Sequence, residues 1–212
     1  NAGGLGSHEQ REGVESACKL GVNFINISPI KSDLHLKKGE WVKINPNSDV
    51  ALILAIAFHL DKNKLVNHSF LKKYTVGYDR FINYVKGNVD GVSKDANWAS
   101  KITGIKYKKI LDLTEKIGKA ERSMISVSWS LTRQDHGEQP FWAAITLASM
   151  LGQIGLPGGG VGFGYSAVNS IGNNFTNIRG VSVPQGENKA GSFIPVARIT
   201  DMLEKPTESF QY

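Results

Sequence analysis

Apolar residues recur along the chain with two spacings, and these predict helices and short strands in alternation. Segments in which apolar residues return every three or four positions are expected to be helices, and short β-branched runs are expected to be strands. Helices are predicted in 7–20, 45–63, 69–75, 78–87, 95–104, 107–121 and 138–153, and strands in 21–27, 40–45 and 123–129. This alternation predicts the α/β class, with an open, mostly parallel sheet flanked by helices as in dinucleotide-binding domains.

The ends of the first helix and the burial of its apolar side follow from local sequence. Ser7 is expected to cap it, with Gln10 completing a capping box. Cys18 and Leu20 share its apolar side, so Cys18 is expected to be buried. The second helix is expected to be capped by Asn47 or Ser48 and to be buried on most sides, since its first turns are apolar all round.

The segment 123–160 runs from an apolar strand to a glycine run. The strand 123–129 is nearly continuous in apolar character, which predicts burial as in a parallel sheet. Gly155 and Pro157 are expected to stop the last helix, and the three glycines 158–160 are expected to allow an abrupt turn or a close approach. Beyond residue 160 the chain is rich in Gly, Asn and Ser, which predicts an α/β domain over 1–160 and a loop-rich start of a further domain over 161–212.

Composition and charge exclude several classes of protein. The chain has 212 residues, 41% hydrophobic content and a formal net charge of +6. Its lysines are scattered rather than gathered with aromatic residues, which argues against nucleic-acid binding, whereas a phosphate-rich cofactor would suit a basic domain. The single cysteine, Cys18, excludes an internal disulfide and a cysteine-only metal site. The longest apolar run, "VALILAIAF", is too short for a membrane span.

Hydrogen-bonding residues follow each predicted strand, in "INISP", "NPNSD" and "SWSLTR". Ligands of open α/β sheets lie beyond the carboxyl ends of strands, and helix N-termini bind phosphate because their first N–H groups have no partner. These three strand exits therefore suggest a nucleotide site without the usual glycine fingerprint.

Each polar residue at these exits has both a structural and a functional interpretation. Asp49 suits the positive end of a helix dipole, but its carboxylate can also accept from the N1–H and N2–H₂ edge of guanine. Arg133 is either a surface ion-pair residue or a bidentate phosphate ligand, and Trp129 is either core or a flat wall for a cofactor ring. His136 is interpreted as a turn residue, because no second histidine or carboxylate has metal-ligand spacing with it. Glu138 is expected to open the last helix.

Four segments resemble a known family, in order and without large gaps. They are "NPNSDVALILAIAFHL", "FLKKYTVGYDRFINYVKG", "DGVSKDANWASKITGI" and "SWSLTRQDHGEQPFWAAITLASMLGQIGLPGGGVGFGY". These segments resemble the molybdopterin oxidoreductase superfamily, and within it the S- and N-oxide reductases that act on dimethyl sulfoxide, trimethylamine N-oxide or biotin sulfoxide. The run "HGEQPFW…GQIGLPGGG" is its most specific part, and 184–206 resembles the same group less specifically.

The resemblance implies an internal portion of a large enzyme that carries molybdenum on bis(molybdopterin guanine dinucleotide) and transfers oxygen atoms from small S-oxide or N-oxide substrates. It places the metal ligand and the residues at the metal upstream of this chain, so it names no catalytic and no metal-ligating residue here. The cofactor contacts that it implies are Ile27, Ser28, Asn47, Ser48, Asp49, Trp129, Ser130 and Arg133. Those residues occupy the three strand exits.

The chain departs from the family pattern at all three exits. Relatives often have "INP" where this chain has "ISP" and "QTD" where it has "NSD", and Thr132 and Asp135 stand where they commonly have glutamine and histidine. Oxygen, amide or carboxylate functions remain at most of these positions.

Other interpretations stay open. Formate dehydrogenase and nitrate reductase belong to the same superfamily, and a non-catalytic nucleotide-binding α/β domain would share the exits. The resemblance implies an electron donor, for which a cytochrome-type protein is a candidate. It implies no nucleic-acid partner. It leaves the compartment open between periplasm and cytoplasm, with the periplasm favoured.

Overall fold

A computed structural model of the chain describes residues 10–31, 39–163, 184, 186–189, 191, 193–194 and 198–206. The chain divides into two compact units, residues 1–173 and 174–212. Ser7, expected to cap the first helix, and most of the segment 161–212 lie outside the described residues. The domain division at residue 160 therefore stays a prediction.

The described helices and strands confirm the alternation that the sequence predicts. The helices are α1 (Gln10–Lys19), α2 (Asp49–Lys62), α3 (His68–Tyr74), α4 (Tyr78–Val85), α5 (Ala96–Thr103), α6 (Tyr107–Lys119), α7 (Gln139–Leu151) and α8 (Ile199–Glu204). The strands are β1 (Ile25–Ser28), β2 (Glu40–Lys43), β3 (Met124–Val127) and β4 (Gly160–Phe163). A short 3-10 helix, η3 (Trp129–Thr132), follows β3.

Helix α2 is the centre of the first unit, as its apolar sequence predicts. It packs against α5, α6 and α7. Eight of its residues are buried, from Ala51 to Leu60. Its fully buried side chains join Ile110, Leu113 and Met150 in one core cluster. Because α2 is enclosed, the position of its first residue, Asp49, is fixed by the core rather than by a loop.

The ends of several helices are fixed by side chains or by glycine. Asp95 accepts a hydrogen bond from Trp98 N at 2.9 Å and so caps α5. Helix α7 ends at Gly152, whose φ of +68° is the left-handed conformation that favours glycine. The prediction that Gly155 and Pro157 stop this helix was therefore wrong by a few residues. A Cβ at Gly152 would also lie 2.4 Å from Nδ2 of Asn67.

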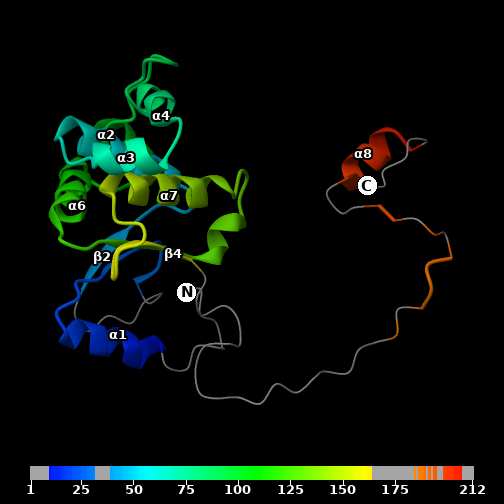
Figure 1. Cartoon of the computed structure of the whole chain (residues 1–212), viewed down its shortest axis with the longest axis horizontal. Helices are drawn as coiled ribbons and strands as arrows, with labels where there is room; N and C mark the ends of the chain where they lie inside the picture. The colour runs from blue at the N-terminus through cyan, green and yellow to red at the C-terminus, as the bar shows by residue number, and fades with distance from the viewer. Residues whose placement is uncertain are drawn as a thin grey trace. The chain divides into compact units, whose positions relative to one another are not determined.

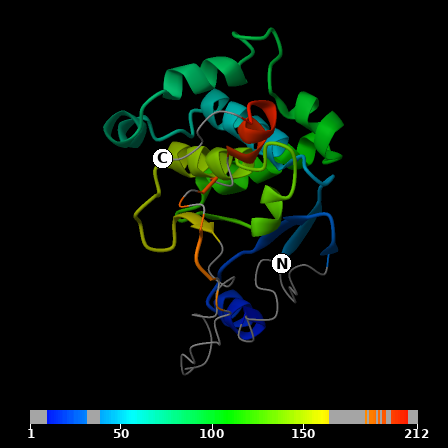
Figure 2. The same ribbon diagram turned by 90° about the vertical axis from the view of Figure 1, so that its right-hand side faces the viewer.

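The strands form two separate two-stranded parallel sheets among the described residues. In one, β1 pairs with β2, with Ile25 opposite Glu40; in the other, β3 pairs with β4, with Met124 opposite Gly160. Figure 1 shows the strands between α1 on one side and α2, α6 and α7 on the other, and Figure 2 shows the same layers after a 90° turn. The α/β class and the parallel pairing are confirmed, whereas a single open sheet is not seen.

Two expectations about burial were wrong, and one strand was not predicted. Met124 of β3 is 55% exposed, so this strand is not buried on both faces. Residues 160–163 form β4, although glycine-rich sequence carries little strand signal. Leu20 is 86% exposed because it follows the last turn of α1, and Cys18 is only partly buried.

Candidate functional site

The first strand exit is held by hydrogen bonds within the protein. Ile27 packs against the main core, and Ser28 is buried at the end of β1. The Ser28 hydroxyl donates to the Ile30 carbonyl at 2.5 Å and accepts from Ile30 N at 3.2 Å. The Ser28 carbonyl accepts from Nε1 of Trp41 at 3.1 Å. These contacts fix the direction in which the chain leaves β1.

The second strand exit is clamped to the end of α5. Nδ2 of Asn45 donates to the Ile102 carbonyl at 2.9 Å, and its backbone N–H donates to the Thr103 carbonyl at 2.8 Å. Ser48 occupies the N-cap position of α2, but its hydroxyl donates to the Asn45 carbonyl at 2.6 Å and makes no cap bond. Asn47 is exposed, with a left-handed φ of +62°. The first N–H groups of α2 therefore have no side-chain cap.

Asp49 is the first residue of α2 and is the charged group of this exit. Its side chain is half-buried, and no described residue forms an ion pair or a side-chain hydrogen bond with it. Burial raises the pKa of the Asp49 carboxyl above its usual value of 3.8, and the hydrogen bond to its own backbone N–H opposes that shift. A partly desolvated carboxylate without a donor side chain is suited to accept from N–H groups of a ligand.

The third strand exit displays an indole, a hydroxyl and a guanidinium. Trp129 is 41% exposed, so the core interpretation of this residue was wrong. The hydroxyls of Ser128 and Ser130 are 2.9 Å apart, and Ser128 accepts from Ser130 N at 3.3 Å. Arg133 ends η3 through its backbone N–H, which donates to the Ser130 carbonyl at 3.0 Å. Its guanidinium is exposed and has no ion-pair partner within the described part of the chain.

A tight turn carries the third exit into α7. Gly137 is buried, and a Cβ there would lie 2.5 Å from the carbonyl oxygen of Thr132 and 2.8 Å from its Cα. Only glycine fits this contact without a backbone shift. Gly137 was not among the predicted site residues, and the local signal for it is the "HGEQ" sequence just before a helix.

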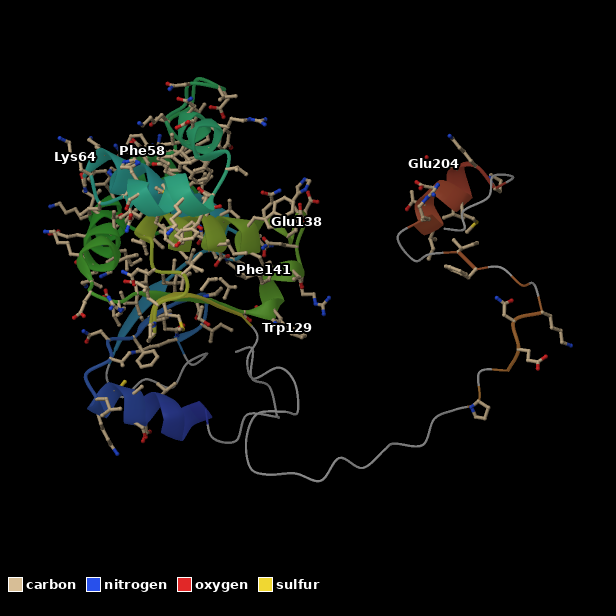
Figure 3. The ribbon with its side chains drawn as sticks, viewed as in Figure 1. Phe58, Lys64, Trp129, Glu138, Phe141 and Glu204 are labelled. Atoms are coloured by element: carbon tan, nitrogen blue, oxygen red, sulfur yellow. The ribbon has the colours of Figure 1, made fainter. Side chains whose placement is uncertain are left out.

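The polar residues of that turn face water. His136 has a left-handed φ of +53°, and its ring nitrogens each lie 3.8 Å from a carboxylate oxygen, one of Asp135 and one of Glu138. Glu138 occupies the N-cap position of α7, which confirms that it opens the last helix. Its own backbone N–H is the main cause of the lowered pKa of its carboxyl. His136 is a turn residue, as expected. Figure 3 shows Trp129, Glu138 and Phe141 along one end of the first unit, with Phe58 and Lys64 at the opposite end in this view.

The structure brings the first two exits to one sheet edge. Strands β1 and β2 are hydrogen-bonded neighbours that run parallel, and Ser28 lies opposite Lys43 at their carboxyl ends. The third exit follows β3, whose hydrogen-bonded neighbour is β4, and so belongs to the other sheet. No group of three or more His, Cys, Asp or Glu residues in the described ranges is arranged to hold a metal ion. Likewise, no helix within those ranges is long and apolar enough to cross a membrane.

The known proteins to which this chain is similar are named as reductases of S-oxides or N-oxides. The chain is 43% identical over 212 residues to biotin sulfoxide reductase from Cereibacter sphaeroides, covering 100% of this chain and 28% of that protein. It is 40% identical over 204 residues to trimethylamine-N-oxide reductase from Haemophilus influenzae, covering 91% of this chain and 25% of that protein. It is 35% identical over 216 residues to dimethyl sulfoxide/trimethylamine N-oxide reductase from Rhodobacter capsulatus, covering 97% of this chain and 26% of that protein. The chain thus spans about a quarter of the length of these relatives.

The fold also has a solved counterpart. Acetylene hydratase from Pelobacter acetylenicus matches 70% of this chain and 20% of its own length, with a TM-score of 0.58 and 17% sequence identity. The profile of the molybdopterin oxidoreductase family matches residues 8–209. The chain therefore belongs to the molybdopterin oxidoreductase family.

Proposed function

We propose that this chain is the part of a molybdenum oxidoreductase that holds a guanine dinucleotide arm of bis(molybdopterin guanine dinucleotide). The whole enzyme would reduce S-oxides or N-oxides, as the names of the relatives indicate for those proteins. In this proposal the reduction proceeds by oxygen-atom transfer. Residues 1–160 form the cofactor-binding domain in this proposal, and residues 161–212 begin the next. A cytochrome-type protein is the candidate electron donor.

The observation that carries the proposal is the state of Asp49. Its carboxylate is partly buried at a helix N-terminus, and burial raises its pKa. No cationic side chain of the described residues offsets that burial. Guanine presents two adjacent N–H donors on its N1 and N2 edge, which a carboxylate can accept together. A guanine base would therefore supply the donors that Asp49 lacks in the protein.

The other exits offer the remaining groups that a dinucleotide needs. The exposed guanidinium of Arg133 can donate to two phosphate oxygens at once. The indole of Trp129, four residues before Arg133 in the chain, presents a partly exposed flat surface. Short hydrogen-bonding side chains come from Ser130, Ser48 and Asn47. The end of β1, formed by Ile27 and Ser28, completes the proposed set of contacts. These residues fit the cofactor in charge and in donor and acceptor character.

Within the enzyme, this chain binds and orients rather than reacts. When bound, the molybdenum centre supplies the oxygen-atom transfer and the accompanying two-electron redox change. Asp49 would select guanine, and Arg133 would neutralise the pyrophosphate. The close contact at Gly137 would fix the turn that follows Arg133.

The test is cofactor retention in variants of the full-length protein at Arg133. Arg133→Ala should lower the content of both molybdenum and guanine nucleotide, and Arg133→Lys should lower it less, since lysine meets phosphate as a point charge. The matched control is Arg80→Ala, which removes another exposed arginine, in α4. An arginine that only forms a surface ion pair contributes about 0–1 kcal/mol to stability, and its loss would leave the cofactor in place. Full cofactor content in Arg133→Ala would therefore contradict the phosphate role.

A further inference from the structure

Asn45 links the end of α5 to the segment that leads into α2. Its backbone N–H donates to the Thr103 carbonyl at 2.8 Å, and its Nδ2 donates to the Ile102 carbonyl at 2.9 Å. Both carbonyls belong to the last two residues of α5, where helix carbonyls have no partner within the helix. Asn45 therefore supplies, from a distant part of the chain, two donors that the end of α5 needs.

The end of α5 is a firm point of attachment. Thr103 is fully buried, and its hydroxyl donates to the Ala99 carbonyl at 2.8 Å and accepts from Ile105 N at 3.1 Å. Ala96 and Ala99 lie in the main core cluster. At the start of the helix, Ala96 N donates to Nε2 of His59 in α2 at 3.1 Å. Because α5 is held by the core along its length, its last carbonyls are fixed in place.

The side chain of Asn45 is confined by Gly104. This glycine follows α5 with a left-handed φ of +72°, and a Cβ there would lie 3.1 Å from Oδ1 and 3.2 Å from Nδ2 of Asn45. The amide thus packs directly against the backbone of Gly104. Since the partner of the amide is a carbonyl, it must present its nitrogen to Ile102.

A closed turn carries this attachment from Asn45 to Asp49. The Ser48 hydroxyl donates back to the Asn45 carbonyl at 2.6 Å, and Ser48 is buried. The Ser48 carbonyl accepts from Leu52 N at 3.3 Å, in the first turn of α2. Pro46, inside the turn, has a fixed φ. The position of Asp49 is therefore tied to Asn45 through one short turn.

We propose that Asn45 is a positioning residue for Asp49, which holds the carboxylate where it can accept from both N–H groups of guanine. The inference rests on the proposed role of Asp49 in guanine recognition. An N–H···O bond forms at donor–acceptor distances of about 2.7–3.2 Å, so two such bonds to one base tolerate only a small displacement of the carboxylate. Asn45 makes no contact with the cofactor in this proposal and acts through the turn 45–48.

The exposure of Asn45 makes the proposal testable without loss of the fold. Asn45 lies at the surface, so its removal leaves no cavity in the core. Asn45→Ala removes the side-chain donor to Ile102 and keeps the backbone N–H that donates to Thr103. The turn should loosen while both helices remain.

The measurement is the rate at which the loaded full-length protein releases guanine nucleotide, below its unfolding temperature. Asn45→Ala should release it about 2- to 10-fold faster, as expected for the loss of one hydrogen bond. In an Asp49→Ala background, which has no carboxylate to position, Asn45→Ala should cause no further increase. A merely structural role would instead give the same factor in both backgrounds.

The control is Asp95→Ala, which removes the cap at the opposite end of α5. It should lower the unfolding temperature and leave the release rate unchanged. The positioning role is overturned if Asn45→Ala releases at the wild-type rate, if its factor is equal in both backgrounds, or if Asp95→Ala accelerates release as much. Each of these results leaves the guanine role of Asp49 intact when Asp49→Ala itself releases faster. Release from Asp49→Ala at the wild-type rate would overturn that role, and the role of Asn45 with it.

Discussion

At the residue scale, Asp49 is predicted to have opposite effects on stability and on the proposed cofactor binding. A carboxyl whose pKa is raised in the fold is penalised when it ionises. As pH rises through 3.8, the carboxyl loses its proton in the unfolded chain before it does in the folded one. The stability that the protonated Asp49 gives to the fold is therefore lost above that pH and stays lost at neutral pH. Asp49→Asn removes that penalty, and the cofactor-free protein should be at least as stable as the wild type near pH 7.

The same change should weaken guanine recognition. Asparagine places a donor where guanine also donates, and a good bidentate base contact contributes about 1–3 kcal/mol of discrimination. The measurement is the guanine nucleotide content of purified full-length Asp49→Asn. Asp79→Asn, in the first turn of α4, is the control and should keep the cofactor. Unchanged content and preference in Asp49→Asn would rule out the selective role.

His59 gives a second prediction at this scale. It is buried in α2, and its Nε2 accepts from Ala96 N, the first residue of α5, at 3.1 Å. Burial, and then the charge of Lys62, lowers the pKa of the imidazole below 6.5, while Asp95 opposes this. A neutral His59 is therefore favoured in the fold, and its contribution is complete above pH 6.5 and lost as pH falls through the lowered pKa.

Thermal unfolding between pH 7.5 and pH 5 checks this dependence. These pH values bracket the ordinary pKa of about 6.5 for histidine. His59→Gln keeps a possible acceptor for Ala96 N–H but cannot be protonated, so its unfolding temperature should depend less on pH than that of the wild type. Equal pH dependence in His59→Gln and the wild type would contradict the role of His59.

At the element scale, the turn between η3 and α7 depends on one glycine. A Cβ at Gly137 would meet the backbone of Thr132 at 2.5–2.8 Å, where no flexible side chain can move aside. Gly137→Ala should destabilise the fold by about 1–3 kcal/mol through overpacking. Denaturant unfolding measures this. Gly13→Ala, in α1 where nothing lies within 4 Å, is the control and should be neutral or stabilising. A Gly137→Ala midpoint equal to the wild type would show that the turn relaxes without cost.

The helices and the parallel pairing were predictable, whereas the division into two sheets and strand β4 were not, for a physical reason. Helix α6 is specified by local periodicity, since its buried residues Ile110 and Leu113 lie three positions apart and so share one face. Strand pairing is a non-local property, so nothing near 123–127 indicates that β3 bonds to β4 rather than to β1. Strand β4, "GVGF", has two glycines and thus little strand signal.

In the candidate site, too, the local features were predictable from the sequence and the non-local ones were not. Its polar groups follow the strands, and strand ends can be read from sequence, so all three exits were predicted. The burial of Asp49 and the close approach at Gly137 depend on packing between distant segments, and sequence alone gave only the "HGEQ" signal for the second. Whether the third exit lies near the first two depends on how the two sheets are arranged, which a local pattern does not encode.

At the scale of the whole molecule, cofactor and fold should be coupled. A ligand that binds only the folded state stabilises it by RT ln(1 + [L]/Kd), about 2.7 kcal/mol at a hundred times Kd. Removing the molybdenum cofactor from the full-length protein should therefore lower its unfolding temperature. The size of that shift measures how much of the binding energy each variant retains.

This coupling distinguishes residues that bind from residues that build the fold. Arg133 is exposed without an ion-pair partner in the described residues, so Arg133→Ala should lower the unfolding temperature of the loaded protein and leave that of the cofactor-free protein unchanged. Gly137→Ala should lower both, because its contact lies within the chain. Calorimetry of both forms of each variant makes the comparison. If Arg133→Ala lowered both temperatures equally, Arg133 would be a structural residue, and its proposed contact with phosphate would be ruled out.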